Sequence, residues 1–299
     1  MTYLPIYIYK EAVPMSIFYL FIIALCILAA ALMMLSIILN TLFWYENLNG
    51  PNCLIPRPKP GLVFVFTKFA RSMASALLCG LLSPFGRYAA VTPGAAREGV
   101  FPQGSPRPPV ILIHGIYNNA SAWLYMARRL RRAGYPVSTF SYKSFNISLD
   151  DISADLDAHV SELERLFPAT RPVLIGHSLG GIIARTWLLR GENHHRPGAL
   201  ITLGTPHEGS KLAVFASGPL ARHLVPGSDL LAALKAAPQP DCPCIALASP
   251  VDDAVLPASS LIPPAGWELL VSEAVGHFYM VLHPGTVDVL LGKLENIGK

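Results

Sequence analysis

Residues 174–181, LIGHSLGG, place Ser178 between Gly176 and Gly180, directly after an apolar run. The pattern G-x-S-x-G between a strand and a helix is typical of a sharp turn that lifts the serine hydroxyl clear of the backbone. Glycines suit the flanking positions because a Cβ there would collide with the adjacent strand or helix. The alternative is an ordinary glycine-rich turn that contains a serine. A base, an acid and an oxyanion site elsewhere in the chain would favour the catalytic interpretation.

The chain around this stretch alternates between short apolar runs and segments with helical spacing. The predicted strands cover residues 110–114, 135–142, 172–176, 198–204, 242–249 and 267–272. The predicted helices cover residues 120–134, 149–167, 179–191 and 285–297. This alternation predicts an α/β fold whose mainly parallel central sheet is covered by helices on both faces. Ligands of such sheets bind at the carboxyl ends of the strands.

A base is available late in the chain. His277, in SEAVGHFYM, follows the predicted strand 267–272 and precedes the final helix. In α/β hydrolases the chain order is serine, then acid, then histidine, each on a loop after a strand. We therefore expect His277 to accept the proton of Ser178, because a serine hydroxyl is a weak nucleophile without a base.

Two adjacent acids follow the strand 242–249. Either Asp252 or Asp253 could orient the imidazole and stabilise the imidazolium, and the other could cap the following turn. Glu273 is a third candidate. The residues alone leave this choice open.

The oxyanion hole is expected to use two backbone N–H groups. One belongs to Leu179, directly after the serine, and the other to Ile116, in the loop after the first strand. Gly115 permits close approach of that loop, and we interpret His114 as a residue that shapes the loop. The amides act by facing the position where negative charge develops.

Five ordered motifs resemble the bacterial triacylglycerol lipase/esterase branch of the α/β-hydrolase superfamily. They are VILIHGIYNNASAW (110–123), LIGHSLGGIIAR (174–185), TLGTPHEGSKLA (202–213), SPVDDAVLP (249–257) and VGHF (275–278). The resemblance implies an α/β-hydrolase fold and a lipase or esterase activity that needs no cofactor. Alignment on S-x-x-D-x-x-V-x-P-x-x-S implies Asp252 as the acid of the triad, whereas alignment on D-x-x-V-P would choose Asp253.

The resemblance also implies a catalytic domain over residues 110–299 with a short cap segment at about 211–241. Phe215, Leu220, Leu224, Leu230 and Leu231 of this segment could form an acyl-chain wall or pack in the core.

The expected activity is hydrolysis of acyl or lipid esters by Ser178, His277 and Asp252 through an acyl-enzyme. The alternatives are acyl transfer, deacylation of lipid-linked substrates, or a hydrolase-fold membrane scaffold without turnover, because the fold does not decide between them.

The amino terminus is unusually apolar. Of the 299 residues 52% are hydrophobic and 14% are charged, and residues 15–45 contain no charge. This run exceeds the ~20 residues that span a bilayer and the roughly 7–15 apolar residues of a signal peptide. We expect a transmembrane helix within a membrane anchor of residues 1–48, ending at an interfacial Trp44 and Tyr45. A buried core helix is the alternative.

Residues 49–109 are expected to form a linker that contains an interfacial amphipathic helix at about 61–87. Lys68 and Arg71 interrupt its apolar sequence, and we expect both to extend to lipid headgroups. A second membrane span is the alternative. On this basis the region after Arg87 should hydrolyse short esters by itself.

The charges that flank the anchor indicate its orientation. Lys10 beside Glu11 precedes the apolar run, and the basic residues that follow it are Arg57, Lys59, Lys68 and Arg71. The positive-inside tendency then predicts a cytoplasmic catalytic domain on a single-pass protein. The resemblance to bacterial lipases implies the bacterial inner membrane.

Other binding functions have little support in the sequence. The net charge of +4 comes without an Arg/Lys array, which argues against nucleic acid as a partner. Cys242 and Cys244 lack a second cluster with zinc-site spacing, and His194 and His195 fall in a predicted surface loop, so no metal site is expected. The expected partners are an ester or lipid substrate and a membrane.

Overall fold

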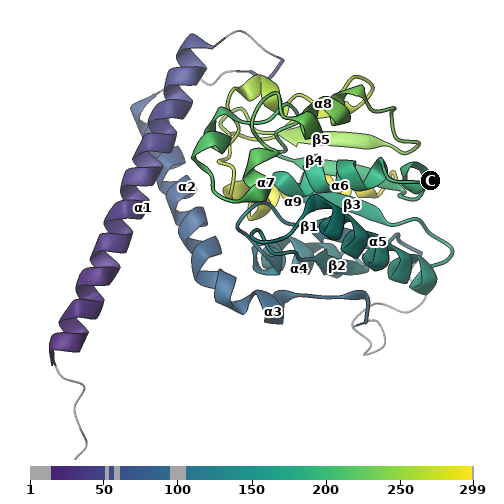
Figure 1. Ribbon diagram of the computed structural model, residues 1–299, viewed down its shortest axis with the longest axis horizontal. Coiled ribbons are helices and arrows are strands. Elements are labelled where there is room, and N and C mark those ends of the chain that lie inside the picture. The colour runs from purple at the N-terminus through teal and green to yellow at the C-terminus, as the bar shows by residue number, and fades with distance from the viewer. Residues whose placement is uncertain (1–14, 51–53, 57–60, 95–105, 298–299) are drawn as a thin grey trace, which may run out of the picture.

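The computed structural model describes residues 15–50, 54–56, 61–94 and 106–297. In this part of the chain six strands form one parallel sheet in the order β2-β1-β3-β4-β5-β6 (Figure 1). The strands are β1 (Val110–Ile113), β2 (Val137–Phe140), β3 (Val173–His177), β4 (Ala199–Leu203), β5 (Cys244–Ala248) and β6 (Glu268–Val271). Strands β1 to β5 are buried along their whole length, as their continuous apolar sequences predict for a sheet covered on both faces.

Helices cover both faces of the sheet, as predicted. On one face α5 (Leu149–Leu166) and α6 (Leu179–Leu188) pack against the sheet in one apolar core. On the other face α4 (Leu124–Arg132) and α9 (Pro284–Leu294) enclose a second core. The cap segment contains two short helices, α7 (Pro219–Arg222) and α8 (Asp229–Ala236).

The strand order places a crevice at the carboxyl ends of β1 and β3. The chain passes from β1 to β2 on one side and returns to β3 on the other, so the direction of winding reverses between β1 and β3. Open α/β sheets bind ligands at such a point because the loops after the two strands diverge. The loop after β1 carries Ile116, and Ser178 follows β3.

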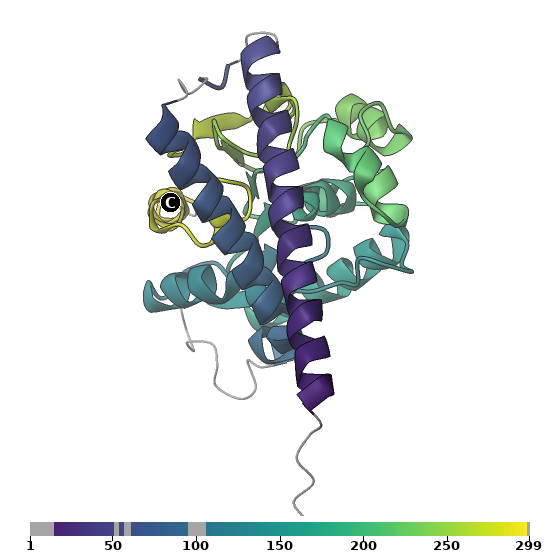
Figure 2. The same ribbon diagram turned by 90° about the vertical axis from the view of Figure 1, so that its left-hand side faces the viewer.

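Two long helices precede the sheet, α1 (Met15–Asn49) and α2 (Leu62–Leu82), followed by the short α3 (Gly86–Ala89). They run beside each other along one side of the α/β domain that contains the sheet (Figure 2). The end of α1 contacts that domain: Phe43 packs with Val251 and Leu256, and Glu46 accepts a hydrogen bond from Lys211 at 2.9 Å. Apolar side chains nearer the start of α1 are exposed, among them Phe18, Leu20, Phe21, Ile27, Met34 and Ile38.

Helix α2 is amphipathic, and it is the polar side of the helix that is buried. Its buried residues are Lys68, Ser72, Ser75 and Cys79, which face the α/β domain. Its exposed residues include Leu62, Val63, Phe66, Leu78 and Leu81. The small and polar side is therefore turned toward protein and the apolar side away from it.

One expectation from the sequence is wrong at Lys68. The Lys68 side chain does not extend to solvent: the residue is 4% exposed and its Nζ lies 3.2 Å from Oδ2 of Asp253. Arg71, one turn further along α2, is exposed. An apolar sequence with two basic residues does not reveal which of them faces a carboxylate distant in the chain.

Among the residues whose side chains the structure describes, one continuous helical stretch, Leu62–Ala89, has the length and apolar composition needed to cross a membrane, and 17% of its most apolar window is buried; α1, several of whose side chains are not described, is not included. Lys10 and Glu11, and much of the two linkers around α2, lie outside the described residues.

Candidate active site

Ser178 occupies a strained turn between β3 and α6. Its φ of 54° and ψ of −123° fall in a region that non-glycine residues rarely adopt. A Cβ on Gly176 would lie 2.5 Å from the backbone nitrogen of Gly181, and one on Gly180 would lie 2.2 Å from the carbonyl oxygen of Ile113. Both glycines are therefore required by close backbone packing, which is the geometry that G-x-S-x-G predicts.

His277 and Asp252 meet across the loops that follow β6 and β5. Nδ1 of His277 lies 2.8 Å from Oδ2 of Asp252, and both side chains are buried. The other oxygen of Asp252 accepts the backbone N–H groups of Ala254 and Val255, each at 3.0 Å. These bonds hold the carboxylate in one orientation and direct the opposite ring nitrogen of His277 away from it.

Gly204, at the end of β4, permits this contact. It has a φ of +54°, and a Cβ there would lie 2.9 Å from Oδ2 of Asp252 and 3.2 Å from Nδ1 of His277. Only glycine combines this backbone conformation with space for both side chains.

Asp253, the other acid, contacts the main chain of His277 and not its ring. Its Oδ1 accepts the backbone N–H of His277 at 3.0 Å, and its Oδ2 faces Lys68. Burial by itself would raise the pKa of the Asp253 carboxyl, but the charge of Lys68 and the hydrogen bonds outweigh burial and hold the pKa below its ordinary value. Of the two neighbouring acids, Asp252 thus contacts the imidazole and Asp253 the main chain.

The carboxylates also set the protonation of His277. Burial would lower the pKa of the imidazole, but the negative charge and hydrogen bond of Asp252, helped by the charge of Asp253, raise it above 6.5. An imidazolium at this position is therefore stabilised, as a residue that takes a proton during catalysis requires.

The loop after β1 approaches Ser178 closely. A Cβ on Gly115 would lie 3.0 Å from the Cβ of Ser178, so a larger residue there would crowd the serine. The next residue, Ile116, lines the same cavity as Ser178. Leu179 is the first residue of α6, where the N–H groups have no partner within the helix. The N–H groups of Ile116 and Leu179 thus belong to the two segments that flank the Ser178 side chain.

Two histidines support these loops. His114 is buried and donates to the carbonyl of Gly115 at 2.8 Å, while the hydroxyl of Tyr142 donates to the His114 carbonyl at 2.8 Å. Burial lowers the pKa of His114 to about 4, so it is neutral near pH 7 and can hold the loop as expected. His177 was not singled out from the sequence. Its Nε2 lies 3.1 Å from the carbonyl oxygen of His277, and the only sequence signal was its place inside G-x-S-x-G.

Ser178 and His277 share one cavity of about 120 Å³. This volume is below the roughly 300–1,000 Å³ of pockets that enclose a drug-sized ligand. The cap contributes to the cavity wall through Leu212, Ala213, Ala216 and Leu224.

The residues proposed from the sequence as an acyl-chain wall are mostly elsewhere. Leu224 lines the cavity, but Leu220 and Leu231 belong to the core around α5 and α6, with Leu230 packed against it. Phe215 is 79% exposed. Spacing identified the apolar positions of the cap but not which of them face the cavity.

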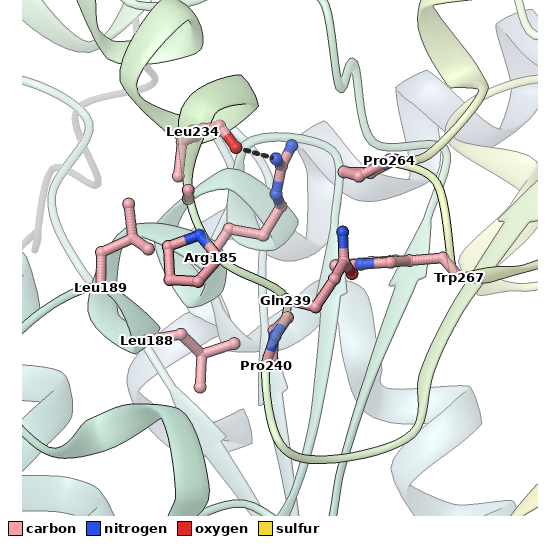
Figure 3. Close-up of a pocket in the computed structure, with 10 residues that line it drawn as sticks. Arg185, Leu188, Leu189, Leu234, Gln239, Pro240, Pro264 and Trp267 are labelled. Carbon is pink, nitrogen blue, oxygen red and sulfur yellow. Dashed lines mark hydrogen bonds between the residues drawn. The ribbon is translucent and has the colours of Figure 1, made fainter.

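A second hollow lies between α6 and the cap, at Arg185 (Figure 3). Arg185 donates to the carbonyl of Leu234 at 2.8 Å, its Nη1 lies 3.1 Å from Nδ1 of His207, and its guanidinium lies over the ring of Trp267. Burial lowers the pKa of Arg185 to about 10. The hollow measures about 20 Å³, which is space for one water molecule. We therefore interpret Arg185 and His207 as structural residues.

Within the described ranges, one group of side chains has metal-ligand spacing. Potential ligand atoms of Glu192, His194 and His195 lie within 4.8 Å of one another. The group precedes β4, at the amino ends of the strands, whereas Ser178 lies at their carboxyl ends. None of its residues lines the cavity.

Comparison with known proteins agrees with this architecture. A family model described as the alpha/beta hydrolase fold matches residues 108–223. The chain has an α/β-hydrolase fold. Among solved structures, it resembles the mature lipase BlEst2 of Bacillus licheniformis, with 24% identity, a TM-score of 0.51, and coverage of 65% of this chain and 94% of that one. It also resembles lipase B of Aspergillus fumigatus, with 14% identity, a TM-score of 0.56, and coverage of 70% and 56%. At these identities the likeness shows the fold.

Among curated proteins, the chain is similar to the sn-1-specific diacylglycerol lipase ABHD11 of Xenopus tropicalis. The two are 36% identical over 90 residues, which are 29% of this chain and 28% of the relative. The corresponding protein of Xenopus laevis is 36% identical over 87 residues. The match therefore spans little more than a quarter of the length of these relatives. The fold predicted from the sequence is confirmed, and its narrower placement in the bacterial lipase branch stays a prediction.

Proposed function

We propose that this chain is a membrane-associated serine hydrolase that cleaves carboxylic esters. The observation that carries the proposal is the convergence of three features: the strained serine turn at Ser178, the 2.8 Å contact between Asp252 and His277, and a cavity lined by both Ser178 and His277. A purely structural role for Ser178 does not explain the strained turn, because backbone strain costs stability that the surrounding packing must offset.

The roles of the residues follow from their positions. His277 accepts the proton of Ser178 as the hydroxyl oxygen attacks the ester carbonyl, and Asp252 stabilises the imidazolium. The N–H groups of Ile116 and Leu179 stabilise the negative oxygen of the tetrahedral intermediate. His277 then gives its proton to the departing alcohol, and water releases the acid from Ser178 by the same steps. These groups complete the reaction without a cofactor.

The membrane part of the proposal rests on the two amino-terminal helices. Residues 17–38 of α1 would extend about 33 Å at 1.5 Å per residue, which matches the ~30 Å hydrocarbon thickness of a bilayer. The described side chains along this segment are mostly exposed and apolar, whereas Phe43 and Glu46, further along α1, contact the hydrolase domain. We propose that residues 17–38 span the membrane and that the apolar side of α2 contacts its surface.

The proposed substrate is an ester with a short acyl chain, or a lipid ester of which only one end enters the cavity. The small cavity accommodates a short acyl group better than a long one. The similarity to a diacylglycerol lipase over 90 residues supports lipid esters as the class to test.

A chain-length series tests this function. Full-length protein in detergent micelles is assayed on p-nitrophenyl esters from acetate to palmitate, and on diacylglycerol in vesicles. We expect kcat/KM to be highest for short chains. Absence of turnover on every ester, with intact folded protein, would contradict the proposed function and favour a scaffold.

A further inference from the structure

Lys68 is a buried cation that α2 brings to the loops of the candidate site. Its Nζ donates to Oδ1 of Asn40 on α1 at 2.7 Å and lies 3.2 Å from Oδ2 of Asp253. The same nitrogen lies 4.1 Å from the centre of the Phe43 ring. A buried ammonium is costly unless it is paired and hydrogen-bonded, and these three contacts meet that requirement.

The ion pair continues to the backbone of His277. Oδ2 of Asp253 faces Lys68, and Oδ1 accepts the N–H of His277 at 3.0 Å. One carboxylate therefore links α2 to the main chain of the residue whose ring contacts Asp252. Removing one partner of such a buried pair leaves an uncompensated charge, which is strongly unfavourable.

The far end of α2 contacts the other loop of the site. The Asn119 side chain donates to the carbonyl oxygen of Ser83 at 2.9 Å. A Cβ on Gly86 would lie 2.5 Å from the same Asn119 side chain. Asn119 follows Ile116 by three residues. Helix α2 and its short extension thus touch both the loop of the expected oxyanion hole and the loop of His277, although neither belongs to the predicted catalytic domain 110–299.

We propose that Lys68 is a positioning residue of the hydrolase, which fixes the main chain of His277 through Asp253. This inference rests on the proposed function. It makes the amino-terminal helices part of the catalytic unit, so that a chain beginning after Arg87 would lack a required contact. The self-sufficient domain expected from the sequence would then have impaired turnover.

The test uses the full-length chain in detergent micelles with a short p-nitrophenyl ester. The variants are Lys68→Met and, to avoid an unpaired buried charge, two neutral doubles: Lys68→Met with Asp253→Asn, and Lys68→Met with Asp253→Ala. Asparagine retains an oxygen that can accept the N–H of His277, whereas alanine does not. Arg71→Met is the matched control, because it removes an exposed cation from the same helix.

We expect Lys68→Met to lower kcat by about 10²-fold, because a displacement of about 1 Å at a reacting group has an effect of this size. KM should change little, since Lys68 does not line the cavity. The double variant with asparagine should recover most of the lost kcat, and the double with alanine should not. Arg71→Met should match the wild type.

Equal kcat in the two neutral doubles would overturn the inference even where Lys68→Met fails to fold, because both doubles lack the unpaired charge. A kcat for folded Lys68→Met equal to that of Arg71→Met would overturn it as well. These results leave the proposed function intact as long as the wild type hydrolyses esters. A wild type without ester turnover would instead overturn the proposed function and this inference together.

Discussion

Oδ2 of Asp252 lies 2.8 Å from Nδ1 of His277, and neither side chain is exposed to solvent. The neighbouring acid, Asp253, reaches only the main chain of the same histidine. Two adjacent carboxylates therefore hold the ring and the backbone of one residue, and substitutions at the two positions should have different consequences.

Asp252→Asn should lower kcat far more than Asp253→Asn. An amide at position 252 favours the wrong tautomer of His277, and losses of order 10⁴ are known for this substitution in a triad. An amide at position 253 keeps an acceptor for the His277 N–H but leaves the buried Lys68 without its carboxylate, so we expect a loss of kcat that is real but well below the order of 10⁴. Steady-state kinetics on a short ester measures both variants, and a larger loss for Asp253→Asn would reverse the two assignments.

The pH dependence of kcat/KM should report His277. The base must be neutral to accept a proton, and its pKa is raised above 6.5 because Asp252 and Asp253 outweigh burial. Activity should therefore fall as the pH drops through this raised pKa. Asp252→Asn removes a negative charge and should move the acid limb to lower pH. A limb unchanged by this substitution would show that another group controls it.

Gly180→Ala should destabilise the protein, because its Cβ would lie 2.2 Å from the carbonyl oxygen of Ile113, a backbone atom. Overpacking of this kind typically costs about 1–3 kcal/mol or more. Gly292→Ala is the control: it lies in α9 with open space around its Cβ and should gain roughly 0.5–1 kcal/mol. Thermal unfolding compares the two, and equal Tm values would contradict the packing of the serine turn.

Charges in the exposed apolar segment of α1 should weaken membrane attachment. Ile27→Lys with Met34→Lys places two lysines within the proposed span, and a lysine at the helix centre, where Ile27 lies, costs about 2.5–3.5 kcal/mol. Leu48→Lys with Leu54→Lys is the control, since these exposed residues lie outside that span. After alkaline carbonate extraction, the first pair should move to the soluble fraction and the control should stay with the membrane. The same distribution for both would contradict the span.

The sequence predicted the fold and the position of the serine because both depend on local patterns. Alternating apolar runs predict parallel strands, and the glycines around Ser178 are dictated by neighbours a few residues away or on the next strand. The roles of Asp252 and Asp253 depend on a loop about 25 residues further on, which no local pattern locates. Lys68 depends on a partner 185 residues away. A lysine in an apolar helix usually faces lipid headgroups or solvent, so its burial was not predictable from spacing.

Reaction with a fluorophosphonate probe tests the central claim, that Ser178 is an activated nucleophile, most directly. Full-length protein is incubated with the probe, and the modified peptide is identified by mass spectrometry. Ser178→Ala is measured beside it, together with ester turnover. We predict one adduct on Ser178 in the wild type, none in Ser178→Ala, and a loss of turnover of roughly 10⁴–10⁶ in that variant. Labelling at another residue, or Ser178→Ala that retains more than about a tenth of wild-type turnover, would contradict the account.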